Sequence, residues 1–144
     1  MNHSVKSIKR RIVYSGYHQI NQVNLQYERF EGGWSPSIQH EVIIRKDAVA
    51  VLLFDPKRSN FVFIEQFRTG ACVRAQDELQ SKSPWLLEIV AGDVEAGESF
   101  EEVAIREVLE ETGLTLRACL PIYEFWVSPA NHSGKIMIFF RQDR

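Results

Sequence analysis

The distribution of apolar and polar residues predicts that the first part of the chain is rich in β-strands. Residues 11–42 form short segments with partial alternation, such as residues 22–30, and glycine-containing turn signals stand at residues 15–16 and 32–33. Alternation with a period of two residues is typical of half-buried strands, and glycine favours turns. We therefore expect a small antiparallel sheet at the N-terminus.

The segments that follow are more apolar and predict core strands. They are residues 41–44, 48–54 and 61–66, with a further short strand expected at residues 85–90. Residues 74–83, which precede this last strand, are polar and lack a regular period. We therefore expect a surface loop there.

One helix is marked at both of its ends. Ser99 and Glu102 have the spacing of a capping box, and Gly113 stands where a left-handed residue is favoured at a helix C-terminus. These signals predict a helix that begins at Ser99 and ends at Gly113. Beyond it, residues 114–125, interrupted at their proline, and residues 135–140 are predicted to form strands.

The size and composition of the chain fit one ordinary globular domain. It has 144 residues, of which 44% are hydrophobic, as in typical single domains. The longest apolar run, residues 48–54, is far shorter than the roughly 20 residues of a membrane span. We therefore expect a cytoplasmic protein without a membrane partner. Cys72 and Cys119 have no metal-binding or redox spacing and are expected to be free thiols.

The charged residues argue against one class of partner and draw attention to one segment. A net charge of −2 gives no reason to expect nucleic-acid binding, and the basic cluster at residues 6–11 is expected to be a solvated segment. Eight of the nineteen acidic residues fall within nineteen consecutive positions. A divalent cation is one means of screening such a concentration of negative charge. The eight are Asp93, Glu95, Glu98, Glu101, Glu102, Glu107, Glu110 and Glu111.

Three of these carboxylates share one side of the predicted helix. Glu107 and Glu111 are four residues apart, and Glu110 is three residues from Glu107, so the three lie close together on consecutive turns. One explanation is a solvated acidic face, on which Arg106 pairs with Glu102 or Glu110.

Two further features favour metal binding over a purely solvated face. Ile105, Val108 and Leu109 supply an apolar stripe for the helix, and a glycine-containing loop with more carboxylates, residues 92–97, precedes it. Magnesium prefers hard oxygen ligands and takes one or two carboxylates together with water and substrate phosphates. We therefore expect Mg²⁺, with Mn²⁺ as an alternative, where the loop meets the helix.

The segment at residues 92–114 resembles the Nudix box at each of its fixed positions. That signature combines two glycines, a glutamate before the helix, an Arg-Glu pair and a Glu-Glu pair within it, and two aliphatic positions. The matching residues are Gly92, Glu98, Arg106, Glu107, Val108, Glu110, Glu111, Gly113 and Leu114. On this match the chain is identified as a member of the Nudix hydrolase family.

The resemblance implies both a fold and a chemistry. The fold is of the α/β class, the Nudix α/β/α sandwich with a mixed β-sheet, here preceded by the small antiparallel N-terminal sheet. The chemistry is metal-dependent hydrolysis of a diphosphate that is linked to a nucleoside.

The resemblance also implies roles for individual residues of the box. Arg106 orients the glutamates, and Glu110 assists the metal directly or through water. The implied metal ligands are Glu107 and Glu111, with Glu98 and the backbone carbonyl of Ala91 as further candidates. The catalytic set is Arg106, Glu107, Glu110 and Glu111.

Outside the box, the chain is most similar to the ADP-ribose pyrophosphatases. This resemblance is carried by residues 48–56, 64–68, 84–92 and 128–129. It implies a small-molecule nucleotide sugar as substrate, with ADP-ribose cleaved to AMP and ribose 5-phosphate. Another nucleoside diphosphate sugar, such as GDP-mannose, stays open as an alternative.

The same resemblance assigns four residues to substrate binding. Arg68 is expected to contact the diphosphate or the terminal ribose, with a surface ion pair as the alternative, and Glu88 to hold the ribose or the metal. Tyr17 is expected to stack on adenine across a homodimer, with a buried aromatic residue as the alternative. Pro129 is associated with ADP-ribose cleavage, although a simple loop proline would explain it equally.

The expected organisation has two parts. Residues 1–45 form a β segment that mediates the homodimer, and residues 46–144 form the Nudix hydrolase domain with its box at residues 92–114. The C-terminal part of the usual fold, which includes a glutamate often assigned as the general base, is expected to be missing after Arg144. A truncated, non-catalytic nucleotide-binding module is therefore the second interpretation.

Overall fold

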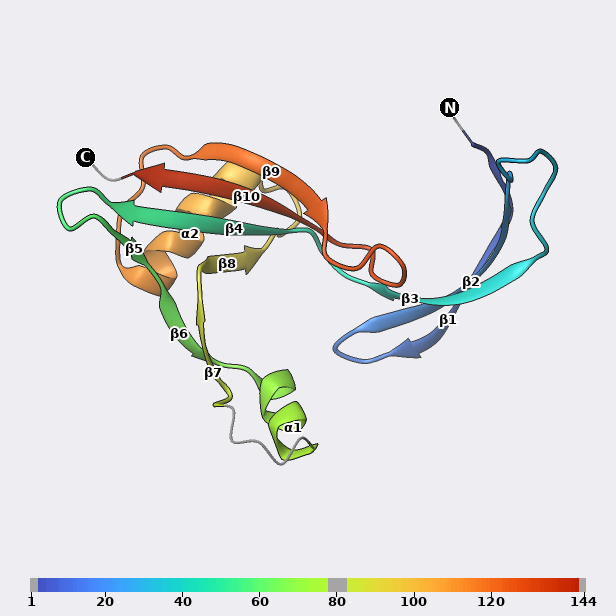
Figure 1. Ribbon diagram of the computed structural model, residues 1–144, viewed down its shortest axis with the longest axis horizontal. Coiled ribbons are helices and arrows are strands. Elements are labelled where there is room, and N and C mark those ends of the chain that lie inside the picture. Colours follow the sequence, from blue (N-terminus) through green and yellow to red (C-terminus); the bar gives the residue numbers. More distant parts are fainter. Residues whose placement is uncertain (1–2, 78–82, 143–144) are drawn as a thin grey trace. The chain divides into compact units, whose positions relative to one another are not determined.

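The computed structural model describes residues 3–77 and 83–142 (Figure 1). The chain divides into two compact units, of which the first comprises Met1–Lys46 and Phe125–Lys135. The second comprises Asp47–Glu124 and Ile136–Arg144. Neither helix in the described part of the chain has the length and apolar character needed to cross a membrane.

The first unit contains the predicted antiparallel sheet. Its strands are β1 (Val5–Ser15), β2 (Gln19–Tyr27) and β3 (Ile38–Ile44), with β2 in the centre. The strand β1 begins earlier than the sequence pattern predicted, so the basic cluster at residues 6–11 belongs to a strand. Two register shifts in the β1–β2 ladder disturb the alternation of side chains, which explains why the pattern did not reveal this start.

The second unit is built on a five-stranded mixed sheet. Its central strand β4 pairs in parallel with β10 and antiparallel with β5 and β8, while β9 lies on the other side of β10. The predicted mixed α/β architecture is therefore confirmed. The strands are β4 (Ala48–Asp55), β5 (Asn60–Val62), β8 (Val90–Asp93), β9 (Leu120–Trp126) and β10 (Lys135–Gln142).

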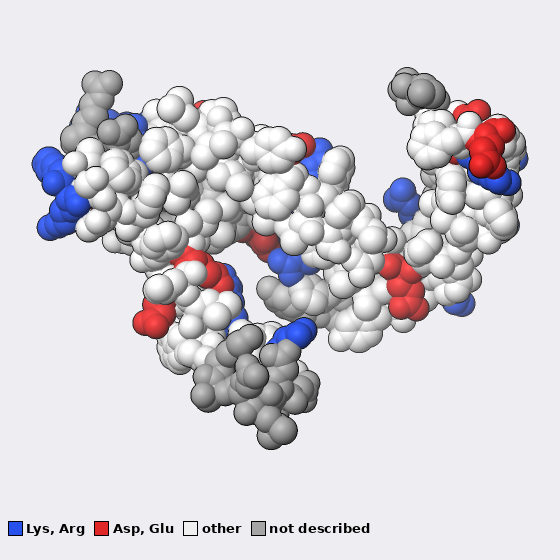
Figure 2. Space-filling view, viewed as in Figure 1, with Lys and Arg blue, Asp and Glu red and all other residues white. Residues whose placement is uncertain are grey.

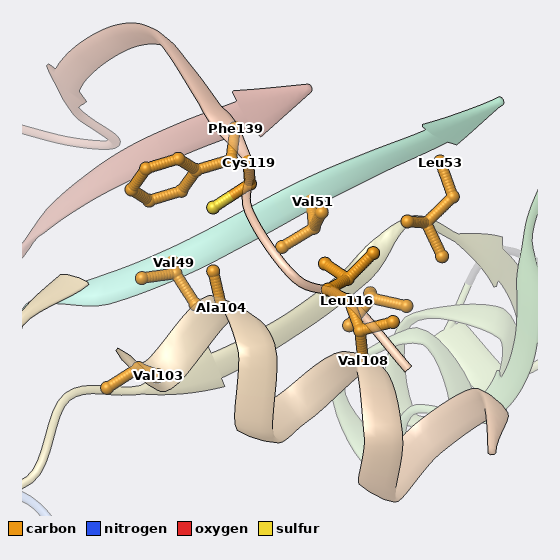
Figure 3. Close-up of a cluster of buried hydrophobic side chains, with 10 residues drawn as sticks. Val49, Val51, Leu53, Val103, Ala104, Val108, Leu116, Cys119 and Phe139 are labelled. Atoms are coloured by element: carbon orange, nitrogen blue, oxygen red, sulfur yellow. The ribbon is translucent and has the colours of Figure 1, made fainter. Parts of the chain in front are cut away.

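The core of this unit lies between the sheet and the helix α2 (Phe100–Thr112) (Figure 3). Alternate residues of a strand point to the same face of the sheet. On β4, the residues of one face pack against the buried side of α2. The buried cluster comprises Val49, Val51, Leu53, Val90, Val103, Ala104, Val108, Leu116, Cys119 and Phe139.

The buried side of α2 differs in one position from the predicted stripe. Val108 is fully buried, as expected, and Ile105 packs at the edge of the cluster. Leu109, however, is 52% exposed. The buried side is centred on Ala104 and Val108, and a residue next to Val108 lies about 100° around the helix from it because the helix has 3.6 residues per turn.

A two-stranded ribbon extends from the sheet and consists of β6 (Ile64–Phe67) and β7 (Trp85–Glu88). Two predicted strands are therefore each shared between the sheet and this ribbon. The apolar segment at residues 61–66 is divided between β5 and β6, and that at residues 85–90 between β7 and β8. A continuous apolar run does not indicate where the chain passes from a strand of one sheet to a strand of another.

The prediction of a loop at residues 74–83 is wrong for residues 74–77. The helix α1 (Thr69–Asp77) covers residues 74–77, and residues 78–82 lie outside the described part of the chain. Val73 and Arg74 are exposed, and the sequence of residues 74–77 has no apolar period that would have revealed the helix.

The segment after α2 also departs from the prediction, because β9 begins only at Leu120 rather than at residue 114. The apolar residues before it, Leu116 and Cys119, are buried in the core without being part of a strand.

Both cysteines are free thiols, as expected. The strand β9 leaves Leu120 and Ile122 exposed, and the surface over it is largely uncharged in Figure 2.

Candidate functional site

The helix α2 is fixed at both ends by the contacts that its sequence predicted. The Ser99 Oγ accepts a hydrogen bond from the Glu102 backbone N–H at 3.3 Å, and the Glu102 carboxylate accepts one from the Ser99 N–H at 2.8 Å. At the other end Gly113 has φ 71° and its N–H donates to the Leu109 carbonyl. The hydrogen bond from the Ser99 backbone lowers the pKa of Glu102. Glu102 is thus used as a cap.

Arg106 joins three of the predicted site glutamates. Its Nε and Nη2 donate to the two oxygens of Glu98 at 3.0 and 3.2 Å. Its Nη1 donates to Glu107 at 2.6 Å and to Glu110 at 3.3 Å. The hydrogen bonds to Glu98 and Glu107 raise the pKa of Arg106. This geometry fits the orienting role that the box resemblance assigns to Arg106.

Glu111 is held by neutral donors from two other elements. Its Oε1 accepts a hydrogen bond from Gln66 Nε2 of β6 at 2.6 Å, and its Oε2 accepts one from the Ala91 N–H of β8 at 3.2 Å. No motif in the sequence pointed to Gln66, which lies 45 residues from its partner. The only local signal was its place in the segment at residues 64–68, two positions before Arg68.

A steric constraint explains why the first position of the box is a glycine. A Cβ added to Gly92 would overlap the carboxyl group of Glu107. The missing side chain therefore lets this carboxylate lie against the backbone of β8. Only 13% of the Glu107 side chain is exposed, so the close approach also removes most of it from solvent.

Arg68 and Glu88 form an ion pair across the β6–β7 ribbon. The Arg68 Nε lies 3.0 and 3.1 Å from the two Glu88 oxygens, and its Nη2 lies 2.5 Å from Oε2. These hydrogen bonds raise the pKa of Arg68 and lower that of Glu88. The charge of Glu111 also contributes to the raised pKa of Arg68. The ion pair that the sequence left as an alternative is formed, and it stands beside the box.

Tyr17 and Pro129 belong to the first unit. Tyr17 is 91% exposed and packs edge-on against the ring of His18, so the alternative of a buried aromatic residue is wrong. Pro129 lies in the exposed turn that joins β9 to β10. The substrate-binding roles of both residues stay predictions.

The chemistry of the site suits a hard divalent cation. Glu107 and Glu111 lie one turn apart on α2, and both are partly withdrawn from solvent. Among residues 3–77 and 83–142, no three or more histidine, cysteine or acidic side chains are arranged to enclose a metal ion. Magnesium does not require such a cage, because water and substrate phosphates complete its coordination. The residues therefore fit the cation that the box implies.

Known proteins match this chain over most of its length. The chain is 38% identical over 134 residues to the ADP-ribose pyrophosphatase of Escherichia coli (strain K12), and 33% identical over 135 residues to that of Haemophilus influenzae. These matches cover 93% and 94% of this chain but 61% of each relative. The chain thus spans about three fifths of the length of these relatives.

More distant proteins match as well. The GDP-mannose pyrophosphatase of Cronobacter sakazakii is 29% identical over 145 residues, covering 99% of this chain and 71% of that protein. A solved structure described as an ADP compounds hydrolase has a TM-score of 0.67 at 20% identity, covering 99% of this chain and 68% of the other. This likeness confirms the fold.

A family model decides membership. The model of the NUDIX domain matches residues 44–143, which is most of the chain and includes the whole box. The fixed positions of the box, the fold and the identity to curated relatives all agree with that match. This chain belongs to the Nudix family.

Proposed function

We propose that this protein hydrolyses the diphosphate of ADP-ribose to AMP and ribose 5-phosphate. One water is consumed, one P–O bond of the anhydride breaks, and each product retains one phosphate. The observation that carries the proposal is the network in which Arg106 holds Glu98, Glu107 and Glu110 beside Glu111. Identity of 33% and 38% to ADP-ribose pyrophosphatases supports the choice of substrate.

The protein's part in this reaction is to hold the cation and the diphosphate. A bound Mg²⁺, or Mn²⁺ in its place, would neutralise charge on the diphosphate and lower the pKa of a water molecule. Glu107 and Glu111 are the proposed ligands. The carbonyl of Ala91 is a third, because the N–H and C=O of a strand residue point to the same side and this N–H donates to Glu111.

Arg68 is the proposed ligand for the diphosphate. Its side chain is 47% exposed, and its guanidinium can bind phosphate oxygens through two parallel hydrogen bonds. The ion pair with Glu88 is no obstacle, because exposed pairs contribute only about 0–1 kcal/mol. We propose that Glu88 keeps Arg68 extended beside Glu111 until substrate binds.

GDP-mannose is the second candidate substrate. It is favoured by the match to GDP-mannose pyrophosphatases, which covers 99% of this chain at 28–29% identity. The lower identity places it after ADP-ribose. The homodimer, the cytoplasmic location and the role of Tyr17 stay predictions.

The test is hydrolysis by the purified 144-residue chain. ADP-ribose, GDP-mannose and other nucleotide sugars would be incubated with Mg²⁺ and then with EDTA, and the products would be separated by chromatography. We expect ADP-ribose to be cleaved fastest, with activity lost in EDTA and in Glu107→Gln. Glu101→Gln, on an exposed position of the same helix, is the matched control and should retain activity.

Two outcomes would contradict the proposal. Faster cleavage of GDP-mannose than of ADP-ribose would replace the substrate while leaving the reaction class intact. A folded chain that binds ADP-ribose but cleaves no nucleotide sugar would favour the nucleotide-binding module instead.

A further inference from the structure

The contact between Gln66 and Glu111 joins the β6–β7 ribbon to the box helix. An ionised carboxylate only accepts hydrogen bonds, so the nitrogen of the Gln66 amide must face Glu111. In the structure, Gln66 Nε2 donates to Glu111 Oε1 at 2.6 Å. The second carboxylate oxygen accepts from the Ala91 N–H at 3.2 Å. With one donor on each oxygen, the plane of the carboxylate is fixed.

The pleat of β6 explains why Gln66 faces the helix. Residues two apart on a strand point to the same side. Ile64 packs against the buried cluster under α2, and Gln66 is partly buried on the same side, whereas Glu65 and Phe67 are exposed. Core packing of Ile64 therefore delivers the Gln66 amide to the helix.

The place of Glu111 on α2 disfavours negative charge. It lies in the last turn of α2, which contains no basic residue, and the C-terminal end of a helix dipole disfavours negative charge. Glu107 adds a like charge one helical turn away from Glu111. Arg106 donates to Glu107 and Glu110, while the hydrogen bonds to Glu111 come from the neutral groups of Gln66 and Ala91.

Neutral donors have a specific advantage at a metal ligand. They fix the direction of the carboxylate without cancelling the charge that attracts a cation, and a carboxylate has about four acceptor sites, so two stay available. We propose that Gln66 is a positioning residue that orients Glu111 for binding a divalent cation. This inference deepens the proposed function, on which it rests for its effect on turnover.

The experiment measures Mn²⁺ binding to the full chain without substrate, by electron paramagnetic resonance at pH 8. Gln66→Met keeps the length of the side chain but removes the donor. Gln66→His places a ring N–H near the amide position and is mainly neutral at this pH. We expect Mn²⁺ affinity to fall about 10- to 100-fold in Gln66→Met, as for other groups that orient metal ligands. Gln66→His should recover part of the loss.

A double-mutant cycle separates this role from a general structural one. If Gln66 acts through Glu111, Gln66→Met should have little further effect on Mn²⁺ affinity in a Glu111→Gln background. It should keep its effect in a Glu107→Gln background, because Glu107 is held by Arg106 instead. Gln39→Met, at an exposed position of β3, is the matched control and should bind Mn²⁺ like the wild type. Circular dichroism checks that each variant is folded.

The outcomes distinguish the two proposals. Wild-type Mn²⁺ affinity in folded Gln66→Met would overturn the positioning role, even if ADP-ribose is hydrolysed. Equal losses in both backgrounds would overturn it as well, and so would a wild-type chain that binds no Mn²⁺. Weakened Mn²⁺ binding in Gln66→Met together with an absence of ADP-ribose hydrolysis would support the positioning role and contradict the proposed function.

Discussion

The helix α2 and the strand β1 are of similar length, with 13 and 11 residues, but they use their apolar residues in opposite ways. Val103, Ala104 and Val108 of α2 have no exposed surface, whereas every residue of β1 is exposed. Among them Ile8 is 51% and Ile12 is 58% exposed.

The difference shows what each apolar pattern determines. In α2, burial of one side fixes the rotation of the helix, and this rotation sets the direction of Glu107 and Glu111. In β1, backbone pairing with β2 defines the strand, and its apolar side chains are left at the surface. Exposed apolar residues on a long strand are typical of interaction surfaces.

The largest expected effect contrasts a buried residue with an exposed one. Leu53 is 1% exposed, and Leu53→Ala is expected to lower the free energy of unfolding by about 2–5 kcal/mol through lost burial and a cavity. Ile12→Ala in β1 should change it by no more than about 0.5 kcal/mol. Urea denaturation at low protein concentration measures both. If Ile12→Ala lowered the free energy of unfolding by clearly more than about 0.5 kcal/mol, this would show that β1 is covered by another surface in solution.

A second test asks whether the box depends on close approach of the backbone. Gly92→Ala places a methyl group where the Glu107 carboxyl lies, so Glu107 must move. We expect turnover of ADP-ribose to fall by about 100-fold, the order expected when a catalytic group is displaced by about 1 Å. Gly70→Ala in α1 meets nothing within 4 Å and is the control. Unchanged turnover in Gly92→Ala would contradict the proposed role of Glu107.

A smaller effect is expected at the start of α2. Ser99→Ala removes the hydroxyl that accepts from the Glu102 N–H, and loss of such a cap costs about 1 kcal/mol. Differential scanning calorimetry should show a lower unfolding temperature. Ser4→Ala, at an exposed position just before β1, should leave it unchanged. An equal decrease in the two variants would show that the cap adds nothing specific.

The smallest effect concerns the ion pair of the ribbon. Arg68 holds the pKa of Glu88 below its ordinary value of 4.5, so the contribution to stability is full above pH 4.5 and is lost as the pH falls through the lowered pKa. Arg68→Gln should therefore cost at most about 1 kcal/mol at pH 7, because the pair is partly exposed. The difference from wild type should be smaller at pH 3 than at pH 7.

Urea denaturation at the two pH values measures this difference. Arg29→Gln is the control, because its partner Glu31 is 83% exposed and this pair should contribute less. A cost of Arg68→Gln that is the same at pH 3 and pH 7 would show that Arg68 stabilises the ribbon by packing rather than by charge.

Particular residues show how far the sequence predicts the fold. The capping box at Ser99 and the left-handed Gly113 were correctly placed because each depends on neighbours within one helical turn. The helix α1 was missed in part because residues 74–77 carry no apolar period. The start of β9 was placed too early because Leu116 and Cys119 are buried outside any strand.

The sequence by itself determined the helix α2, the spacing of its glutamates and the identity of the box, because these are properties of residues close together in the chain. Only the tertiary structure decided that Gln66 meets Glu111 across 45 residues and that Arg68 meets Glu88 across 20. The physical reason is that these contacts depend on which strands pair with each other and on which side chains pack in the core. No local pattern of residues contains that information.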